Sequence, residues 1–402
     1  MSSTIIIGAG AVGSALAYYL SKEGEDVTVI DGGGVAEGTT SASFSMHIAT
    51  RKTPRQHFDL AMESGQEHLR LLEALDIPLD SSESWVHPAS VYEWPIDEYE
   101  SELISSRVER VQEWGHPARW ISTEEFGELE PQLRVDGDAD RVAMYPDSYW
   151  YDAPLFARTL TQRAAATGAR FETGRRVVGI ERGDDGVDVI VEGGDRYRAD
   201  RVCIAAGAAA AEIAQLAGFT VPVNRVPGLV LTSEPVEPGL MNGILLHPRV
   251  NLRPAPGGRL TLQSYSEEAH VREDSDAAHI AQLTDRIATL TEQILPAFAG
   301  TGIADAAIGI RPVPADGLPI VGPLDERGQV VIVSAHSAIN LAPVLAKRAT
   351  GELITGTGDD TLAPFRPGRS TLTDPSSGEV DESSREMQRM YVESRSAALP
   401  QA

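Results

Sequence analysis

Lysine and cysteine are scarce in this chain of 402 residues. Lysine occurs only as Lys22, Lys52 and Lys347, so nearly all basic side chains are arginine. The single cysteine, Cys203, excludes an internal disulfide, which is consistent with a reducing compartment. No apolar run approaches the roughly 20 residues that a membrane span needs, and a strand-like segment from residue 4 leaves no room for a signal peptide. We therefore expect a cytoplasmic protein without a membrane span.

Positive charge is also scarce. The chain carries 34 basic residues against 59 acidic ones, which gives a net charge of -25. A surface of this sign argues against nucleic acid or an anionic membrane as a partner. The length and the 42% hydrophobic content support two or three domains with a large core.

The first 31 residues have the pattern of a nucleotide-binding βαβ unit. A β-branched run over residues 4–7 ends at Gly8-Ala9-Gly10-Ala11-Val12-Gly13, and a helical pattern follows directly. Residues 26–30 predict a second strand, which Asp31 follows. A GxGxxG between a strand and a helix, with an acid about 20 residues further on, is typical of dinucleotide binding.

Each glycine of this turn has a predicted role. Gly8 permits the tight turn, Gly10 lets the backbone approach a pyrophosphate, and Gly13 lets the helix pack closely on the sheet. The helix N-terminus faces the phosphates, and Asp31 accepts hydrogen bonds from ribose hydroxyls. The predicted cofactor contacts of this unit also include Ala11, Val12 and Gly32. The alternative is a glycine-rich turn in an ordinary α/β domain.

Strand–helix segments lie at the start, middle and end of the chain, and β-rich blocks interrupt them. This order predicts a nucleotide-binding domain made of residues 1–41, 151–219 and 301–358. A substrate domain would take residues 42–150 and 220–300. Residues 359–402 form a polar C-terminal tail, in which 381–395 is either a surface helix or a solvated segment.

Four segments of the chain resemble the D-amino-acid-oxidase-like flavoproteins, which include glycine oxidase, sarcosine oxidase and the D-amino-acid dehydrogenases. They are GAGAVGSALAYYL with VTVID near the N-terminus, GTTSAS from Gly38, VVGIERGDDGV with RADRVCIAAGAAA in the middle, and GIRPVPADGLPIVGP from Gly309. The resemblance implies a mixed α/β fold. Its FAD-binding domain is Rossmann-like, of the glutathione-reductase type, and is assembled from discontinuous segments. Its substrate domain has a mainly antiparallel sheet.

The resemblance also implies which residues hold FAD. A loop of small hydroxyl residues follows the pyrophosphate and flavin, a backbone position after residue 176 holds the adenine, and a turn after residue 205 covers the ADP half. The segment from Gly309 lies beside the flavin ring, and the loop before the last helix faces its pyrimidine end. The implied cofactor contacts are Gly38, Thr39, Thr40, Ser41, Val177, Val178, Ala206, Gly207, Gly309, Arg311, Ser337, Ala338, Ile339, Asn340 and Leu341.

The implied reaction is the oxidation of the C–N bond of an amino acid or secondary amine to an imine, by hydride transfer to FAD. Arg311, in the GxRP motif, would anchor the substrate carboxylate bidentately, or would only order the flavin-side loop. Arg249 and Asn251 alternate with Arg253 along an expected strand, whose common face is turned either to the flavin or to solvent. Met46 either lines the pocket or fills the core. His47 and His336 contact substrate or have structural roles.

Three departures from the family pattern bear on function. Gly309 stands where sarcosine oxidases tether FAD through cysteine, which predicts non-covalent FAD. No lysine occurs within residues 53–346, so the lysine that assists oxygen chemistry in those enzymes is missing, and O2 or another molecule accepts the electrons. The loop at residues 335–343 is two residues shorter than usual, which suggests an unusual or N-substituted substrate.

Two other functions remain open from the sequence. An NAD(P)-dependent dehydrogenase would use the same nucleotide fold, and a non-catalytic flavoprotein-like subunit of a complex would explain the altered loop at residues 335–343. No motif indicates a metal site. The oligomeric state is undetermined, and a homo-oligomer is possible.

Overall fold

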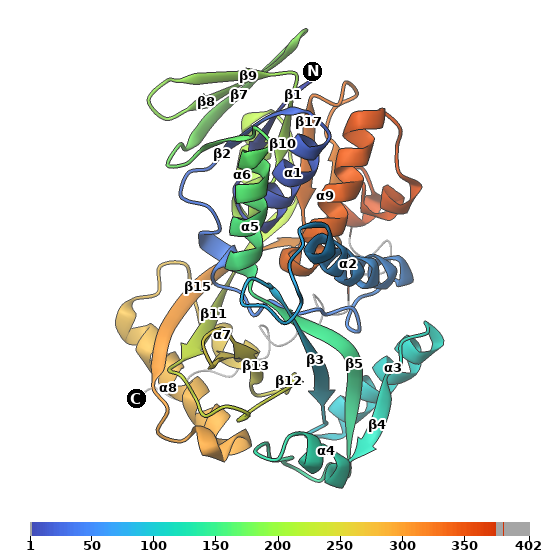
Figure 1. The fold of residues 1–402 in the computed structure, drawn as a ribbon, viewed down its shortest axis with the longest axis vertical. Helices are drawn as coiled ribbons and strands as arrows, with labels where there is room; N and C mark the ends of the chain where they lie inside the picture. Colours follow the sequence, from blue (N-terminus) through green and yellow to red (C-terminus); the bar gives the residue numbers. More distant parts are fainter. Residues whose placement is uncertain (1, 375–380, 382–402) are drawn as a thin grey trace.

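A computed structural model describes residues 2–374 and 381, and these form two lobes along the long axis of the molecule (Figure 1). A six-stranded sheet lies at the centre of the upper lobe, and an eight-stranded sheet at the centre of the lower lobe. The long strands β11 and β15 extend from the lower lobe towards the upper one.

The six-stranded sheet has the order β16-β17-β10-β1-β2-β6, and only β16 runs antiparallel to its neighbour. Its strands are short and rich in Ile and Val, because a parallel sheet covered on both faces buries nearly every side chain. They are β1 (Ser3–Ile7), β2 (Asp26–Ile30), β6 (Arg170–Glu172), β10 (Arg201–Ile204), β16 (Ile320–Pro323) and β17 (Val330–Ser334).

Helices cover one face of this sheet, and a small three-stranded sheet packs with one helix on the other face. Helix α1 packs against α5 and α9, and α2 packs on the outer side of α9 (Figure 1). Small residues on α1 allow this close packing, since Ala15 and Ala17 are fully buried. The helices of this lobe are α1 (Ala11–Lys22), α2 (Arg55–Ala74), α5 (Ala153–Ala166), α6 (Ala210–Leu216) and α9 (Ala338–Thr355), with short 3-10 turns η1 (Gly38–Thr40) and η2 (Gly207–Ala209). A separate three-stranded sheet contains β7 (Val177–Gly183), β8 (Gly186–Val191) and β9 (Arg196–Ala199).

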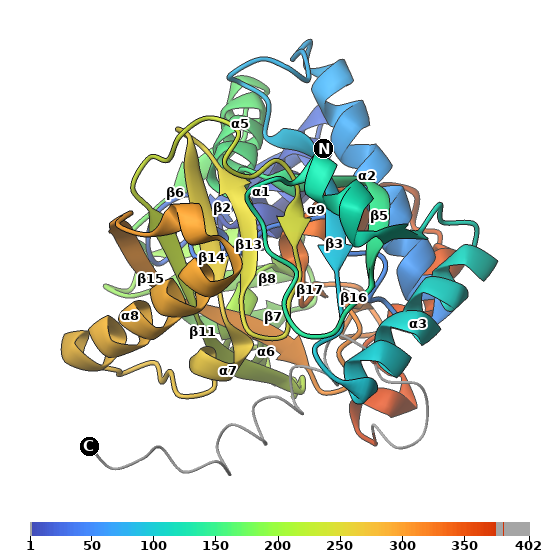
Figure 2. The same ribbon diagram turned by 90° about the horizontal axis from the view of Figure 1, so that it is seen from below.

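The eight-stranded sheet has the order β15-β11-β14-β13-β12-β3-β5-β4, and every neighbouring pair is antiparallel except β12 with β3. Helix α8 lies across its outer face (Figure 2). The strands are β3 (Val86–Glu93), β4 (Arg119–Ser122), β5 (Arg141–Tyr151), β11 (Val223–Ser233), β12 (Ile244–Leu245), β13 (Asn251–Ala255), β14 (Arg259–Gln263) and β15 (Ile303–Pro314). The helices are α3 (Glu98–Glu113), α4 (Thr123–Leu129), α7 (Tyr265–Glu268), α8 (Ala277–Ile294) and η3 (Pro296–Phe298). The predicted mixed α/β fold with a mainly antiparallel second sheet is confirmed.

The sheets differ from the sequence prediction in two places. Strand β15 pairs along its length with β11 in the eight-stranded sheet, although the sequence assigned residues 301–358 to the nucleotide domain. Strand β13 begins at Asn251, so Arg249 lies in the preceding turn and does not share a strand face with Asn251. The division into two domains stays a prediction.

The start of the predicted polar tail packs onto the protein. Leu362 and Phe365 are fully buried in η4 (Asp360–Phe365), and η5 (Ser370–Leu372) follows. Arg369 forms an ion pair with Asp316 at 2.7 Å. The segment 381–395, predicted as a helix or a solvated stretch, lies outside the described residues except for Asp381, whose side chain is buried.

Candidate active site

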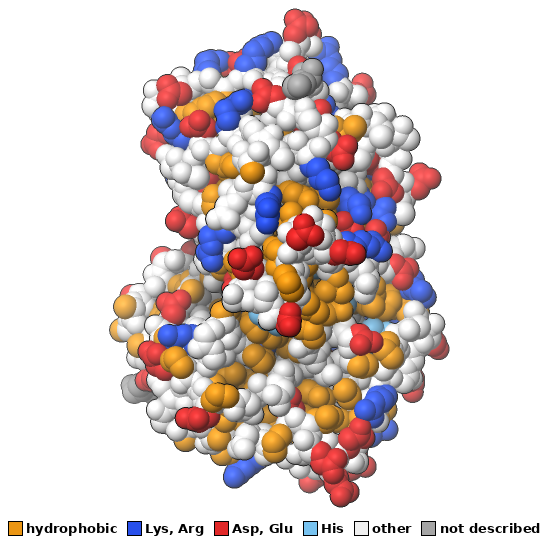
Figure 3. Space-filling view, viewed as in Figure 1, with side chains coloured by type: hydrophobic (Ala, Val, Ile, Leu, Met, Phe, Trp, Pro, Cys, Tyr) orange, Lys and Arg blue, Asp and Glu red, His pale blue; other side chains and the backbone are white. Residues whose placement is uncertain are grey.

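A cavity of about 870 Å³ extends from the β1–α1 turn to strand β15 and the start of α9. Four of its lining residues follow the carboxyl ends of parallel strands: Gly8 after β1, Asp31 after β2, Ala205 after β10, and Ala335 after β17. This edge is where ligands bind in open α/β sheets. Hydrophobic side chains gather over the waist between the lobes, whereas charged ones are spread around both lobes (Figure 3).

The glycines of the first turn are needed for close approach of backbone to backbone. Gly8 has φ +112°, which other residues rarely adopt, and a Cβ on it would overlap the carbonyl of Ala205. A Cβ on Gly13 would overlap the carbonyl oxygen of Gly8. Gly13 therefore packs helix α1 against the turn and does not itself line the cavity, whereas Gly10 does.

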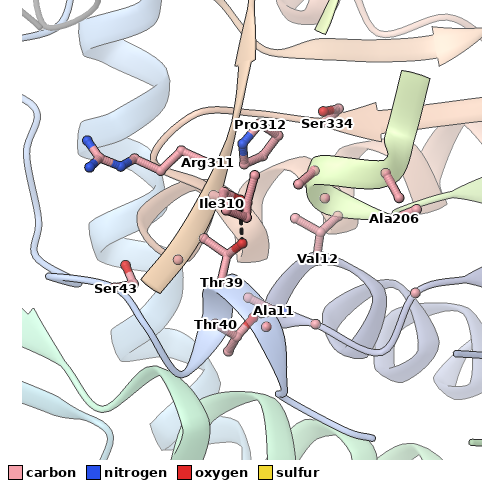
Figure 4. Close-up of a pocket in the computed structure, with 18 of the residues that line it drawn as sticks. Ala11, Val12, Thr39, Thr40, Ser43, Ala206, Ile310, Arg311, Pro312 and Ser334 are labelled. Carbon is pink, nitrogen blue, oxygen red and sulfur yellow. Dashed lines mark hydrogen bonds between the residues drawn. The ribbon is translucent and has the colours of Figure 1, made fainter. Parts of the chain in front are cut away.

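Two loops converge on this turn from the side of the cavity. The carboxylate of Asp31 accepts hydrogen bonds from the backbone N–H groups of Ala9 and Gly33, both at 2.7 Å. Thr40 Oγ1 accepts from the N–H of Ala11 at 3.2 Å. Thr39 Oγ1 donates to the carbonyl of Ile310 at 2.5 Å, which joins η1 to β15 (Figure 4). The backbone around the α1 N-terminus is thereby fixed before any ligand binds.

The N-terminus of α9 forms the wall opposite α1. Its N-cap, Ser337, has φ +59°, a left-handed conformation that residues other than glycine rarely adopt. Lys52 Nζ donates to Ser337 Oγ at 3.0 Å and forms an ion pair with Asp381 at 3.6 Å. Both charged side chains are fully buried. A buried cation thus lies directly behind a residue that lines the cavity.

Three buried polar atoms at this wall have no hydrogen-bond partner in the protein: Ser334 Oγ, His336 Nδ1 and Asn340 Nδ2. All three residues line the cavity. Buried polar groups are costly unless they are paired, so these atoms indicate a ligand with several hydrogen-bonding groups. Burial and, to a smaller extent, the charges of Lys52 and Arg311 lower the pKa of His336 to about 3, so its imidazole is neutral near pH 7.

The other end of the cavity lies at β15, β11 and the segment around Met46. The side chain of Arg311 extends away from Val12 and Ala206 (Figure 4). Its guanidinium is ion-paired with Glu268, and the Tyr265 ring centroid lies 5.9 Å away.

Most of the residues predicted from the sequence come together around this cavity. They are Gly8, Gly10, Ala11, Val12, Asp31, Gly32, Gly38, Thr39, Thr40, Met46, Val177, Val178, Ala206, Gly207, Gly309, Arg311, His336, Ser337, Ala338, Ile339 and Asn340. Gly13, Ser41 and Leu341 do not line it, although each is next in the chain to a residue that does. The contacts of all these residues with a cofactor stay predictions.

Three predicted substrate residues do not line the cavity. His47 is buried with Nε2 3.2 Å from the carbonyl oxygen of Ala61 in α2. Arg249 is half exposed and forms an ion pair with Asp136 at 3.0 Å. Asn251 Oδ1 accepts from the N–H of His247 at 3.1 Å, beside a separate small pocket. Each side chain therefore has a structural partner in place of a ligand.

Sequence reasoning missed three residues beside Arg311. Gln263 and Tyr265 line the cavity, and Glu268 lies directly behind Arg311. The only sequence signal was their position: Gln263 ends the strand 259–263, whose alternation would turn it inward, and the other two residues follow that strand. Nothing in the sequence pairs Glu268 with an arginine 43 residues away.

Cys203 is fully buried in β10, between β1 and β17, and does not line the cavity. Burial raises the pKa of its thiol to about 12, so it is uncharged and unreactive at neutral pH.

The family described as FAD dependent oxidoreductase (DAO) matches residues 3–352. The chain belongs to this family. The predictions of the family, of FAD as cofactor and of an enzyme are thereby confirmed. Membership of this family also decides between FAD and NAD(P), since the family is FAD-dependent.

Two glycine oxidase comparisons and one further structure agree with this family. Glycine oxidase of Geobacillus kaustophilus (strain HTA426) is 28% identical over 351 residues, which cover 84% of this chain and 89% of that protein. The crystal structure of glycine oxidase from Geobacillus kaustophilus has a TM-score of 0.80 at 22% identity and covers 92% of this chain and 99% of its own. The structure of iminodiacetate oxidase from Chelativorans sp. BNC1 has a TM-score of 0.77 at 20% identity. The match covers 90% of this chain and 98% of that protein. The structural matches show that the fold is shared.

Neither a metal cluster nor a membrane span is found in the part of the chain that the structure describes. No three His, Cys, Asp or Glu side chains in residues 2–374 and 381 are grouped as metal ligands. Every helix among those residues is too short or too polar to traverse a bilayer.

Acid is expected to destabilise this protein through buried neutral histidines. Burial lowers the pKa of His47 to about 4 and of His68 and His336 to about 3. Between these pKa values and about 6.5, the unfolded chain binds more protons than the folded protein. The free energy of unfolding therefore decreases as the pH is lowered, by up to about 1.4 kcal/mol per pH unit for each histidine. Denaturant unfolding between pH 7 and pH 5 measures this slope, and His47→Gln should flatten it. If the His47→Gln variant kept the wild-type slope, the buried neutral His47 would not be a cause of the acid sensitivity.

Proposed function

We propose that this protein oxidises the C–N bond of an amino acid or secondary amine to an imine with non-covalently held FAD. The observation that carries the proposal is one continuous cavity, which extends from the glycine turn before α1 to the side chain of Arg311. One part suits a dinucleotide, and the other suits a small polar substrate. The membership of the family supports the chemistry, and the position of Cys203 away from the cavity supports the lack of a thioether link.

The residues around the cavity fit FAD. The α1 N-terminus, with Gly10 and Ala11, would hold the pyrophosphate, and Asp31 would hold the adenosine ribose. The unpaired polar atoms of Ser334, His336 and Asn340 would meet the polar edge of the isoalloxazine. Bound FAD supplies the acceptor for a hydride taken from the carbon of the C–N bond.

The chain itself supplies orientation and a dry site. Arg311 would meet the polar group of the substrate, and the apolar side chains of Phe44, Met46 and Leu246 would exclude water beside it. His336 is neutral at physiological pH, so it would hydrogen-bond without adding charge. The substrate amine would need to be neutral to release a hydride, and the imine would then hydrolyse.

An N-substituted amine is the finer part of the proposal. One structural relative is named for iminodiacetate, an N-substituted glycine. In this chain, the side chains of Phe44, Ser45 and Met46 border the cavity. We propose that this bulk and the short loop at residues 335–343 shape the pocket for a substrate other than glycine.

Anaerobic reduction tests the function directly. The purified protein should be yellow, and its flavin absorbance should bleach when a suitable amine is added without oxygen. The panel contains glycine, sarcosine, D-amino acids, N-substituted amino acids, and the amides and alcohols derived from them. Mixing the reduced protein with O2 and with an artificial acceptor identifies the electron acceptor. Full FAD occupancy with no bleaching by any member would contradict the proposal.

A further inference from the structure

Arg311 is held from three sides by the protein itself. Glu268 of α7 forms an ion pair with its guanidinium, and the ring of Tyr265 lies 5.9 Å from it. A Cβ on Gly228 would overlap the guanidinium, so Arg311 lies directly on the backbone of β11. These contacts fix the side chain in one position at the substrate end of the cavity.

Glu268 is itself firmly held. Its side chain is fully buried, whereas that of Arg311 is 13% exposed. Burial raises the pKa of Glu268, whereas the guanidinium of Arg311 favours its ionised form. Gln263 Nε2 donates to Glu268 Oε1 at 2.8 Å, and the backbone N–H of Leu229 also stabilises the carboxylate. Glu268 does not line the cavity, whereas Arg311 and Gln263, which both contact its carboxylate, do. Its carboxylate therefore stays beside the guanidinium when a ligand enters.

The charge of Arg311 is thus compensated before any substrate binds. A guanidinium binds a carboxylate strongly because it is a cation with paired donors. Here an incoming carboxylate would meet a neutral pair and would lie close to the buried negative charge of Glu268. Like charges in a site of low dielectric repel each other. A neutral polar group would accept the same N–H donors without that cost.

We propose that Glu268 determines specificity by competing with substrate carboxylates for Arg311. It favours amines whose group at Arg311 is uncharged, such as an amino-acid amide, an amino-acid ester or an amino alcohol. This inference rests on the proposed function and names the substrate class of the same site. It also distinguishes this chain from an enzyme in which the arginine is an open anchor for α-carboxylates.

Ligand binding tests the inference without turnover. Acetate and acetamide have the same size and differ in charge, and each is titrated into the FAD-loaded protein at constant ionic strength while the flavin absorbance is recorded. In the wild type, acetamide should bind more tightly than acetate, because acetate would lie beside the buried charge of Glu268. Glu268→Gln should tighten acetate binding by about tenfold to a hundredfold, the range for a hydrogen bond to a charged group. Acetamide binding should change by less than about threefold.

Glu267→Gln is the matched control, because it removes the same charge one residue earlier. Glu267 pairs with Arg286, not with Arg311, so both ligands should bind as to the wild type. Wild-type protein that binds acetate more than tenfold tighter than acetamide would overturn the inference, as would weaker acetate binding in Glu268→Gln. If Glu268→Gln loses FAD, the wild-type comparison alone decides. Failure of every amine to bleach the flavin would instead count against the proposed function.

Discussion

Replacing Arg311 with Met is expected to lower the free energy of unfolding by about 3–5 kcal/mol. The change removes the cation from a buried ion pair and leaves the carboxylate of Glu268 inside the protein. Turnover of the substrate found in the amine panel should also fall, by about tenfold to a hundredfold for the loss of a charged hydrogen bond. Urea unfolding of the FAD-loaded protein measures the first effect, and steady-state kinetics the second.

The double variant Arg311→Met with Glu268→Met separates charge from packing. Without the stranded carboxylate, most of the lost stability should return, because apolar residues of similar size often replace buried ion pairs at little cost. Turnover should remain low in the double variant. Additive losses of stability from the two substitutions would show that Glu268 and Arg311 are not energetically coupled.

Gly13→Ala is expected to weaken FAD binding by about fivefold to 150-fold. The new methyl group would overlap the carbonyl oxygen of Gly8, so helix α1 must move away from the turn. Overpacking of this kind costs about 1–3 kcal/mol. We assign that cost to the FAD-loaded form because the turn and the helix N-terminus would both contact the pyrophosphate. Titration of apoprotein with FAD, followed by flavin fluorescence, measures the change.

Gly351→Ala is the control for this substitution. Gly351 also lies inside a helix, α9, but a Cβ there meets no atom within 4 Å. Its replacement should leave FAD affinity unchanged and should stabilise the helix by up to about 1 kcal/mol. Equal FAD affinity in the Gly13→Ala protein would show that the close approach of α1 to the turn is not required.

The nucleotide end of the cavity was predictable because its signals are local. A strand, three glycines, a helix and an acid lie within 31 consecutive residues, and each has one geometric role. The structure places Gly8, Gly10 and Asp31 at the carboxyl edge of the parallel sheet, as that pattern predicts. The resemblance to flavoproteins then located distant segments, such as the one from Gly309, at the same cavity.

The substrate end was predicted less well because its contacts join distant segments. Arg311 was identified from its motif, but its partner Glu268 lies on a short helix of four residues with no recognisable pattern. Arg249 and Asn251 were assigned to one strand face from alternation alone, and the strand begins two residues after Arg249. Alternation predicts a face only where the strand boundaries are known, and these depend on pairing with distant strands.

The burial of Asp381 has a consequence for the order in which the protein matures. Synthesis begins at the N-terminus, so Lys52 leaves the ribosome long before its counter-ion at position 381 is made. The site that encloses Lys52, behind Ser337 and the start of α9, can be completed only when residue 381 is also available. We expect the α9 wall to reach its final shape only after that residue has been synthesised. Capture of the flavin would then follow the synthesis of residue 381.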